Sequence, residues 1–474
     1  MPHIVVIGAG PTGLLTAALL ANEGMRVTVL DRDPGDTAST DATPPRPGRR
    51  PGVAQSGLAH CLMPGGAFIL RDETPTTLDV LRELGGRPHN VIGGTWGIGN
   101  AGFRQPDDDR FETVAARRFL LEAALNATVH EMPGVTVLRG PSHAVTSLVQ
   151  SAESHGVIPH VAGVTTADGR TLPADLVVDA SGRSTRVPAL LADCGVPVIS
   201  ERADAGFRYY TQHFRSPTGS VPPPTSWPVY HHDSLSVVAL PGDNDTWSVT
   251  LVTSERDQEL RVLGQRDTWR RAAALYPRVG HWMDGEPVDG ILAMGSTATS
   301  HRRYVRDGRP VVTGLVPVGD ASATSNPQFG LGMTLGFRQA VLLRDSLLAA
   351  PARRPDEFVL HFAAETEEKI SPVLAGLAAW DRERLAEVDA SIKGQTHRST
   401  DPQWLFRVAL DTARWKDGRI LRAMASVGCG ISTTQEAFAG ADLVSRAMEL
   451  GADAPRYSDP GPTRGELLAA LDSH

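Results

Sequence analysis

Three glycines near the start of the chain have the spacing of a phosphate-binding turn. Gly8, Gly10 and Gly13 form the pattern GAGPTG, which follows the apolar run His3 to Ile7 and precedes a helical pattern. In such a turn the first glycine permits a tight bend, the second lets a pyrophosphate approach the backbone, and the third lets helix and strand pack closely. A second apolar run ends at Asp31, where a carboxylate can bind a ribose hydroxyl. The pattern predicts a dinucleotide site.

The residues around this turn narrow the choice of dinucleotide. Arg32 could contact a 2′-phosphate, as in an NADP site, but the carboxylate of Asp31 beside it would repel that phosphate. FAD or NAD is therefore favoured at this site. Pro11 and Thr12 lie inside the GAGPTG turn and are included among the expected cofactor contacts.

A second cluster of suitable residues lies late in the chain, between Val311 and Ala340. The apolar run there predicts a buried strand that ends at Gly319 and Asp320, which places a carboxylate at the strand edge where ligands of such sheets bind. The segment 330–334 predicts a helix start, whose free amides carry about half a unit of positive charge. This charge favours an electron-rich ring edge, and the glycines let the backbone approach a flat ligand. We interpret the segment as the seat of a flavin ring.

Two polar segments between these clusters could contact phosphate. The apolar run Leu176 to Asp179 leads into a turn that contains Gly182 and Arg183. Arg50 and Gln55 lie at the end of the segment 33–52, which is rich in proline, glycine and aspartate and predicts an irregular excursion. There are two interpretations of the basic residues at this end: they are solvated loop arginines, or they form a basic lid over the pyrophosphate.

The composition excludes several classes of protein. The 474 residues are 41% hydrophobic and 21% charged, which is typical of a globular chain of two or three domains. A net charge of -8 argues against a nucleic-acid partner. The three cysteines have no CxxC spacing and predict a reducing cytoplasm, and no secretion signal or membrane-spanning apolar run is expected. No metal site is expected either, because the adjacent His231 and His232 would point to opposite faces of a strand.

The elements that must position these residues divide the chain into three parts. A discontinuous Rossmann-like α/β domain would bind the cofactor, and its ranges are 1–85, 104–192 and 290–350. Strand-like runs alternate with proline-rich turns in 193–289, which predicts an inserted, mainly antiparallel sheet that binds substrate. The glycine-rich stretch 86–103 is assigned to the same domain. Residues 351–474 have helical spacing and predict a helical C-terminal region that serves as a packing appendage.

Three motifs in this order resemble a known superfamily. GAGPTG near the N-terminus, VVDASGR in the middle and GDASATSNPQFGLGM late in the chain are similar to motifs of FAD-dependent monooxygenases with the para-hydroxybenzoate hydroxylase fold. Among these group A-type enzymes, the tailoring hydroxylases and epoxidases of secondary metabolism resemble the chain most. The resemblance covers residues 1 to about 350 and is strong at the first and third motifs.

The resemblance implies roles for individual residues. The glycines of GAGPTG would hold the ADP pyrophosphate, and Asp31 would bind the adenosine ribose. Arg50 would contact phosphate, Arg118 would reach the ribityl side of the flavin, and Asp320 would bind the ribityl chain. The residues that would line the isoalloxazine ring are Pro327, Gly330, Leu331, Gly332 and Met333. The first four of these are flavin-proximal candidates for a catalytic contribution, while no acid or base is assigned.

The middle motif departs from the pattern of the hydroxylases. Those proteins usually have Gly-Ala-Asp-Gly there, a segment associated with both FAD and NADPH, whereas this chain has Asp179, Ala180, Ser181 and Gly182. Versions with DASGR also resemble halogenases, prenyl reductases and polyether-type epoxidases. NADPH or NADH is therefore a candidate electron donor, and a separate flavin reductase is the alternative.

The resemblance implies oxygen transfer to a small molecule. Reduced FAD would react with molecular oxygen to give a C4a-hydroperoxyflavin, which would hydroxylate or epoxidise a hydrophobic aromatic, polyketide or terpenoid substrate. Candidates for a base are chosen only by their location in the inserted sheet: His213, His231, His232 and Tyr210.

Three alternatives share parts of this pattern. A reductase or dehydrogenase of a prenyl or polyketide substrate would use FAD without oxygen transfer. A halogenase would need an activating lysine in the N-terminal half, but the first lysine is Lys369. A non-catalytic binding protein on the same fold would not need intact cofactor positions, yet the chain retains Gly10, Asp31 and Asp320.

Overall fold

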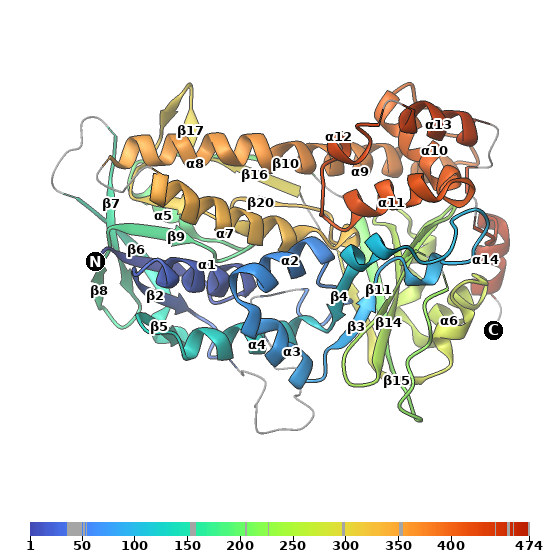
Figure 1. Cartoon of the computed structure of the whole chain (residues 1–474), viewed down its shortest axis with the longest axis horizontal. Helices are drawn as coiled ribbons and strands as arrows, with labels where there is room; N and C mark the ends of the chain where they lie inside the picture. Colours follow the sequence, from blue (N-terminus) through green and yellow to red (C-terminus); the bar gives the residue numbers. More distant parts are fainter. Residues whose placement is uncertain are drawn as a thin grey trace.

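The computed structural model describes most of the chain and places the two predicted sheets at opposite ends of the molecule (Figure 1). The described residues are 1–35, 50, 53, 55–151, 158–203, 206–225, 227–295, 299–349, 354–440, 442–452, 456–457 and 459–472. The predicted excursion at 33–52 lies mostly outside them. Among the helices in these ranges, none is both long and apolar enough to cross a bilayer.

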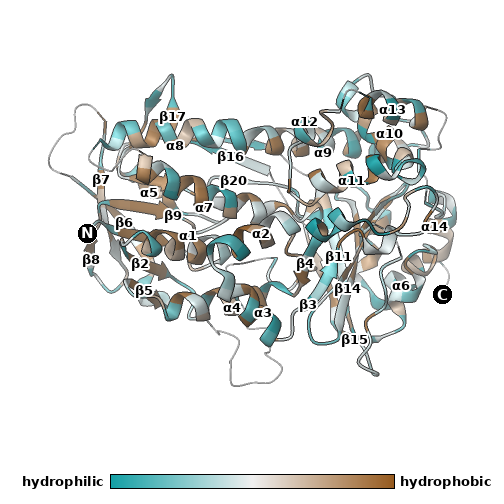
Figure 2. Ribbon diagram, in the orientation of Figure 1, coloured by the Kyte–Doolittle hydropathy of each residue, from teal (hydrophilic) through white to brown (hydrophobic). Residues whose placement is uncertain are grey.

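A five-stranded parallel sheet forms the centre of the cofactor-binding half. Its strands in spatial order are β19 (Leu315–Pro317), β9 (Leu176–Asp179), β1 (His3–Ile7), β2 (Arg26–Asp31) and β5 (Val135–Arg139). Helix α1 (Pro11–Asn22) packs against β1, β2, α4 (Arg118–His130) and α7 (Gly332–Ala349), so it is apolar on nearly every side. Figure 2 accordingly shows α1 and β9 as mainly hydrophobic. The predicted Rossmann-like α/β core is confirmed.

The strand before residues 327–333, the predicted flavin loop, is shorter than expected. The run from Val311 to Val318 predicts one strand, but β19 contains only three residues. Gly314 interrupts the run with a φ of +72°, and a Cβ on it would lie 2.1 Å from the carbonyl oxygen of Val161. The strand therefore begins after this turn, and it still delivers Asp320 to the C-terminal edge of the sheet.

A five-stranded antiparallel sheet forms the other half. Its strands in spatial order are β12 (Val229–His231), β13 (Leu235–Pro241), β14 (Thr246–Ser254), β11 (Phe207–Arg215) and β15 (Glu286–Met294). Successive side chains alternate between its two faces. Tyr210 belongs to a core with residues of α6 (Arg266–Ala274) and α14 (Arg464–Asp472), whereas Tyr209 and Thr211 line a cavity on the opposite face. The predicted antiparallel sheet is confirmed.

Smaller elements complete the chain. The remaining strands are β3 (Arg87–Asn90), β4 (Glu112–Ala115), β6 (Val145–Gln150), β7 (Val161–Thr166), β8 (Thr171–Pro173), β10 (Ile199–Ala203), β16 (Thr299–Arg303), β17 (Val305–Arg306), β18 (Arg309–Pro310) and β20 (Ala323–Thr324). The remaining α-helices are α2 (Pro64–Glu73), α3 (Pro75–Glu83), α5 (Val187–Asp193), α8 (Pro355–Lys369), α9 (Ser371–Ile392), α10 (Pro402–Lys416), α11 (Gly418–Gly428), α12 (Thr434–Ala437) and α13 (Leu443–Gly451). Strand β3 belongs to the predicted substrate domain but pairs with β4 of the predicted cofactor domain, and β15 crosses the predicted boundary at residue 289. The domain limits given above therefore stay a proposal.

Candidate active site

A cavity of about 860 Å³ lies between the C-terminal edge of the parallel sheet, the antiparallel sheet and the C-terminal helices. This edge is where ligands bind in sheets of this kind. The cavity is lined by most of the predicted cofactor residues: Gly8, Gly10, Pro11, Thr12, Asp31, Arg32, Arg50, Gln55, Arg118, Gly182, Arg183, Asp320, Pro327, Gly330, Leu331, Gly332 and Met333. Three other predicted residues are not part of its lining: Gly13, Asp179 and Gly319.

The three glycines of the N-terminal motif have different surroundings. A Cβ on Gly8, whose φ is +107°, would lie 2.5 Å from the carbonyl oxygen of Ala180. A Cβ on Gly13 would lie 2.0 Å from the carbonyl oxygen of Gly8. The absence of a side chain at this position is therefore what lets α1 pack on the turn. Apart from its chain neighbours, the nearest described atom to a Cβ on Gly10 is Nη2 of Arg118, 3.9 Å away. Gly10 therefore opens to the cavity, as the approach of a pyrophosphate requires.

A cluster of charged residues surrounds Asp31 at the end of β2. The Asp31 carboxylate accepts hydrogen bonds from the amide of Ala9 at 2.7 Å and from Arg50 at 2.9 Å. Arg50 also donates to Glu122 at 2.8 Å, and Arg118 donates to the same carboxylate at 2.7 Å. Burial acts to raise the pKa of Glu122, but the charges of Arg118 and Arg50 outweigh it and lower that pKa. Oδ1 of Asp31 accepts only one backbone amide among the described donors, so it can still accept a ribose hydroxyl.

Asp320 lies at the edge of the sheet in the short helix η6 (Gly319–Ala321), as the sequence predicts. The backbone of this element is held in place, because the Gly319 amide donates to Gln339 at 2.8 Å and Arg302 donates to the Asp320 carbonyl at 3.2 Å. Within the described ranges, no residue donates a hydrogen bond to the Asp320 carboxylate. The carboxylate can therefore accept hydroxyl groups of a ligand such as a ribityl chain.

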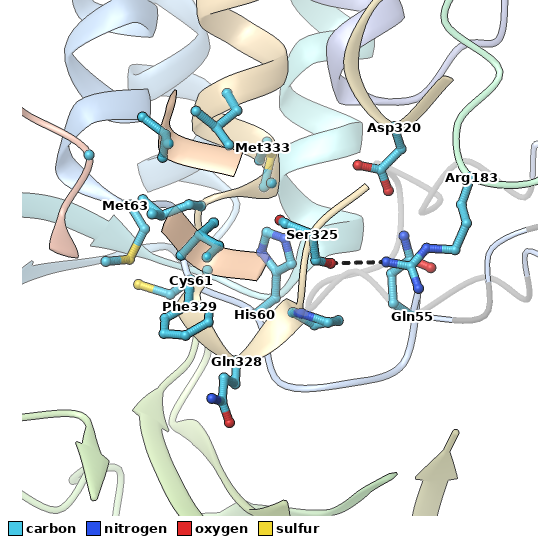
Figure 3. Close-up of a pocket in the computed structure, with 18 of the residues that line it drawn as sticks. Gln55, His60, Cys61, Met63, Arg183, Asp320, Ser325, Gln328, Phe329 and Met333 are labelled. Atoms are coloured by element: carbon cyan, nitrogen blue, oxygen red, sulfur yellow. Dashed lines mark hydrogen bonds between the residues drawn. The ribbon is translucent and has the colours of Figure 1, made fainter. Parts of the chain in front are cut away.

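The loop that precedes α7 has a shape suited to a flat ligand. Asn326 caps the short helix η7 (Pro327–Phe329) by accepting a hydrogen bond from the Gln328 amide at 3.0 Å. Gly330 then takes a φ of +67°, and α7 begins at Gly332. The first amides of a helix lack partners within it, so this end favours negative charge in the cavity. Figure 3 shows side chains around this loop: Met63, Asp320, Ser325, Phe329 and Met333.

The middle motif forms a polar turn beside this loop. Asp179 is fully buried, and its carboxylate accepts hydrogen bonds from the hydroxyls of Ser181 and Thr185. Burial raises the pKa of Asp179, although these hydroxyls oppose the shift. Arg183 lines the cavity and donates to the carbonyl of Ser325 at 3.2 Å (Figure 3). The motif thus reaches the cavity through Gly182 and Arg183, while Asp179 stabilises the turn from behind.

Aromatic side chains line the part of the cavity beyond the flavin loop. The Trp380 ring of α9 lies 4.9 Å from Phe329, 5.0 Å from His231 and 6.5 Å from Trp404 of α10, measured between centroids. Residues of α11 line the same cavity. The interpretation of the C-terminal helices as a packing appendage is therefore incomplete. Helical spacing predicts a buried face, but it does not tell whether that face meets the core or a cavity.

The four candidates for a base do not share one site, and His213 contacts the carbonyl of Gly57 instead of the cavity. Among His213, His231, His232 and Tyr210, only His231 lines the cavity that the described residues enclose. Tyr210 faces the opposite core, where the ring of His232 contacts that of Tyr276 at a tilt of 50°, with centroids 4.6 Å apart. Burial and the charge of Arg384 hold the pKa of His231 well below its usual range, so its ring is neutral at physiological pH.

Several residues of the site carry no signal in the sequence. His60, Cys61 and Met63 line the cavity next to the flavin loop (Figure 3). Burial, helped by the charge of Arg118, lowers the pKa of His60 to about 3, so this ring is also neutral. These residues follow an irregular segment without periodicity, and no sequence pattern connects them with the flavin loop. Only the packing of the chain brings them there.

A buried hydrogen-bond chain joins three elements next to Pro327. Tyr209 of β11 donates to Oδ1 of Asn326, and Nδ2 of Asn326 donates to Oδ1 of Asp381 of α9 at 2.7 Å. Asp381 is 4% exposed, and its Oδ2 has no hydrogen-bond partner among the described residues. Burial raises the pKa of Asp381 to about 7, although the Asn326 hydrogen bond and the charge of Arg407 oppose the shift. These hydrogen bonds connect the flavin loop to the antiparallel sheet and to the C-terminal helices.

Comparisons with known proteins agree with this geometry. Residues 3–60 match the family described as FAD dependent oxidoreductase. Protein Rv3254 of Mycobacterium tuberculosis is 28% identical over 395 residues, which cover 78% of each chain. PqsL of Pseudomonas aeruginosa, a probable FAD-dependent monooxygenase, has a TM-score of 0.58 at 16% identity, covering 82% of this chain and 96% of that chain. The Diels-Alderase PyrE3 of pyrroindomycin biosynthesis has a TM-score of 0.58 at 20% identity, covering 91% and 81%.

These matches confirm the predicted cofactor and fold. The matched residues 3–60 include the glycine motif and Asp31, and the cavity fits FAD because it is open at Gly10 and presents the Asp320 carboxylate. The two solved structures share the fold with this chain but differ in their reactions. The reaction must therefore be argued from the site.

Replacing Asp320 by alanine is expected to weaken FAD binding about 10- to 100-fold, because a hydrogen bond to a charged group contributes roughly 1.5 to 3 kcal/mol. The apoprotein should keep its melting temperature, since no described residue depends on this carboxylate. Titration of the apoprotein with FAD, followed by flavin fluorescence, gives the dissociation constant. Asp345→Ala on the exposed side of α7 is the control. Equal FAD affinity in the two variants would remove Asp320 from the site.

Proposed function

We propose that this chain, an FAD-dependent oxidoreductase, is a monooxygenase that hydroxylates or epoxidises a hydrophobic small molecule, such as an aromatic, polyketide or terpenoid compound. The continuous cavity carries this proposal. Its residues run from Gly10 and Asp31 through the Pro327 loop to Trp380 and Trp404. A cofactor held at one end and an apolar ligand at the other would therefore share one space.

The residues of the cavity have distinct roles in this proposal. Asp31 would hold the adenosine ribose and Asp320 the ribityl chain, so the ring would lie against the loop from Pro327 to Met333. When bound and reduced, FAD supplies the electrons that activate molecular oxygen. The first amides of α7 would stabilise negative charge at the ring edge that faces them.

The aromatic wall would position the substrate and exclude water. Trp380, Phe329 and Trp404 present large apolar surfaces around one volume. Excluding water from this volume protects an activated oxygen species from loss before transfer. The antiparallel sheet would contribute the opposite wall through Tyr209 and Thr211.

The electron donor is proposed to be NADPH or NADH, or else a separate flavin reductase. Ser181 stands where the hydroxylases usually have aspartate, and its hydroxyl donates to the buried Asp179. The turn is thus built differently from the segment that is associated with NADPH in the hydroxylases. A reducing cytoplasm belongs to the same proposal, because all three cysteines are free.

The proposal is tested by the spectrum and the oxygen consumption of the purified protein. A yellow protein whose flavin is reduced anaerobically by NADH or NADPH, and whose oxygen uptake yields an oxygenated product, would support a monooxygenase. Reduction only by an added flavin reductase would identify an external donor. Turnover of a prenyl or polyketide compound without oxygen uptake would instead identify a reductase or dehydrogenase. A colourless protein that cannot be loaded with FAD would contradict the proposal.

A further inference from the structure

An arginine that makes no hydrogen bond or ion pair with the described residues lines the apolar part of the cavity, although the carboxylates of Asp381, Asp411 and Asp401 act on its charge from a longer distance. Arg407 of α10 is half-buried and lines the cavity together with Trp380, Leu377 and Trp404. Among the described residues, none forms a hydrogen bond or an ion pair with its guanidinium. A guanidinium keeps its charge under all ordinary conditions, and placing it among apolar groups costs free energy unless an acceptor compensates it.

The other arginines nearby already have carboxylate partners, whereas the Asp381 carboxylate has a hydrogen bond at one oxygen only. Arg456, which lines the same cavity, donates to Glu387 at 2.5 Å and to Asp411 at 2.8 Å. Arg414 donates to Asp459 at 3.4 Å. The Asp381 carboxylate accepts from Asn326, as described above. Arg407 thus differs from the neighbouring arginines in having five donor hydrogens left for a ligand.

A glycine on the facing helix makes room for this guanidinium. Gly376 lies inside α9 and lines the cavity one turn before Trp380. Among the described residues, and leaving aside the neighbouring backbone of α9, the only atom within 4 Å of a Cβ built on Gly376 is Nη2 of Arg407, at 3.4 Å. Glycine inside a helix costs about 1 kcal/mol relative to alanine. A side chain at this position would stand against the guanidinium of Arg407. The guanidinium therefore lies beside α9 where a side chain at position 376 would stand, in the cavity that Trp380 also lines.

We propose that Arg407 binds an acidic oxygen group of the substrate, a carboxylate or an enolate, while the ring of the substrate packs on Trp380. This inference rests on the proposed function, because it assumes that the apolar part of the cavity holds the substrate. A planar guanidinium matches two oxygens of a delocalised anion with two parallel hydrogen bonds. The substrate would then be an aromatic or cyclic organic anion.

The test uses two probes that share one ring system and differ in charge. Binding of 2-naphthoate and of its neutral counterpart 2-naphthamide to the FAD-loaded protein is measured by calorimetry at neutral pH. The wild type is expected to bind the naphthoate more tightly than the amide. Arg407→Met should weaken naphthoate binding about 10- to 100-fold and leave the amide unchanged, because a hydrogen bond to a charged group contributes about 1.5 to 3 kcal/mol. Arg407→Lys should retain part of the preference, since it keeps the charge but not the planar fork.

Arg446→Met is the matched control, because Arg446 lies on the exposed surface of α13. It should leave both affinities unchanged, and melting temperatures of the loaded variants verify their folding. The inference is overturned if the wild type shows no preference for the anion, if it binds neither probe while it holds FAD, or if Arg407→Met keeps the preference. Failure of the proposed function has a different signature, namely a protein that cannot be loaded with FAD or that never couples oxygen uptake to an oxygenated product.

Discussion

Replacing Gly13 by alanine is expected to lower the free energy of unfolding by about 3 kcal/mol, even without cofactor, because the added methyl would overlap a backbone atom. Its Cβ would lie 2.0 Å from the carbonyl oxygen of Gly8 and 3.2 Å from the Cβ of Ala180. Backbone atoms cannot rotate away as a side chain can, so α1 would have to move from the sheet. Urea denaturation of the apoprotein measures the loss.

Gly10→Ala is the matched variant, and it should behave in the opposite way. Gly10 has an extended backbone with φ of -79°, which alanine adopts without strain, and among the described residues its Cβ would meet only Arg118 at 3.9 Å. The apoprotein should therefore lose less than about 1 kcal/mol. The methyl would project into the cavity at the point where a pyrophosphate is expected to approach the backbone. FAD affinity should therefore fall at least about 10-fold. A stable Gly13→Ala apoprotein, or a Gly10→Ala protein with normal FAD affinity, would contradict the assigned roles of these glycines.

Asp381→Asn is expected to stabilise the protein at alkaline pH. Burial raises the pKa of Asp381 from its usual 3.8 to about 7, so the folded protein keeps this proton in a pH range where the unfolded chain has lost it. The folded state binds more protons there, and its stability falls as the pH rises from about 4 to about 7. The full penalty is present above pH 7 and is at most about 4 kcal/mol. Asparagine does not ionise, so the variant should gain that amount above pH 7 and nothing near pH 4.

Urea denaturation of wild type and variant at several pH values tests this prediction. The difference between the two curves isolates Asp381 from all other titrating groups. Its oxygen can still accept the hydrogen bond of Asn326 in the variant, so the chain to Tyr209 should persist. Asp79→Asn on the exposed face of α3 serves as the control and should leave the pH dependence unchanged. Parallel curves for wild type and Asp381→Asn would show that the carboxylate is ionised in the folded protein.

The position of Asp381 also suggests why the protein retains a costly buried carboxylate. Asp381 holds Asn326, which caps the helix that begins at Pro327, and Asn326 in turn accepts from Tyr209 of the antiparallel sheet. The loop that would carry the flavin ring is therefore connected to both walls of the cavity. Removing the acceptor with Asp381→Ala should loosen this connection and be visible as a change in the flavin spectrum of the loaded protein, whereas Asp381→Asn should keep the spectrum.

The sequence alone determined the cofactor end of the site. The turn around Gly8, the strand that ends at Asp31 and the late strand, loop and helix around Asp320 each depend on short-range geometry. A turn that only glycine can adopt, and a strand that stops at a carboxylate, leave a local pattern of residue types and spacing. The fold class and the cofactor follow from such patterns, and both are confirmed.

Only the tertiary structure decided what faces the substrate end. Trp380, Asp381 and Arg407 lie on helices whose spacing is that of any packed helix, and their neighbours Phe329 and Tyr209 are more than 50 residues away in the chain. Contacts of this kind depend on how helices dock against a sheet, and no local pattern records that docking. The sequence therefore identifies the groups that would hold FAD, whereas the packed structure identifies those that would choose the molecule placed beside it.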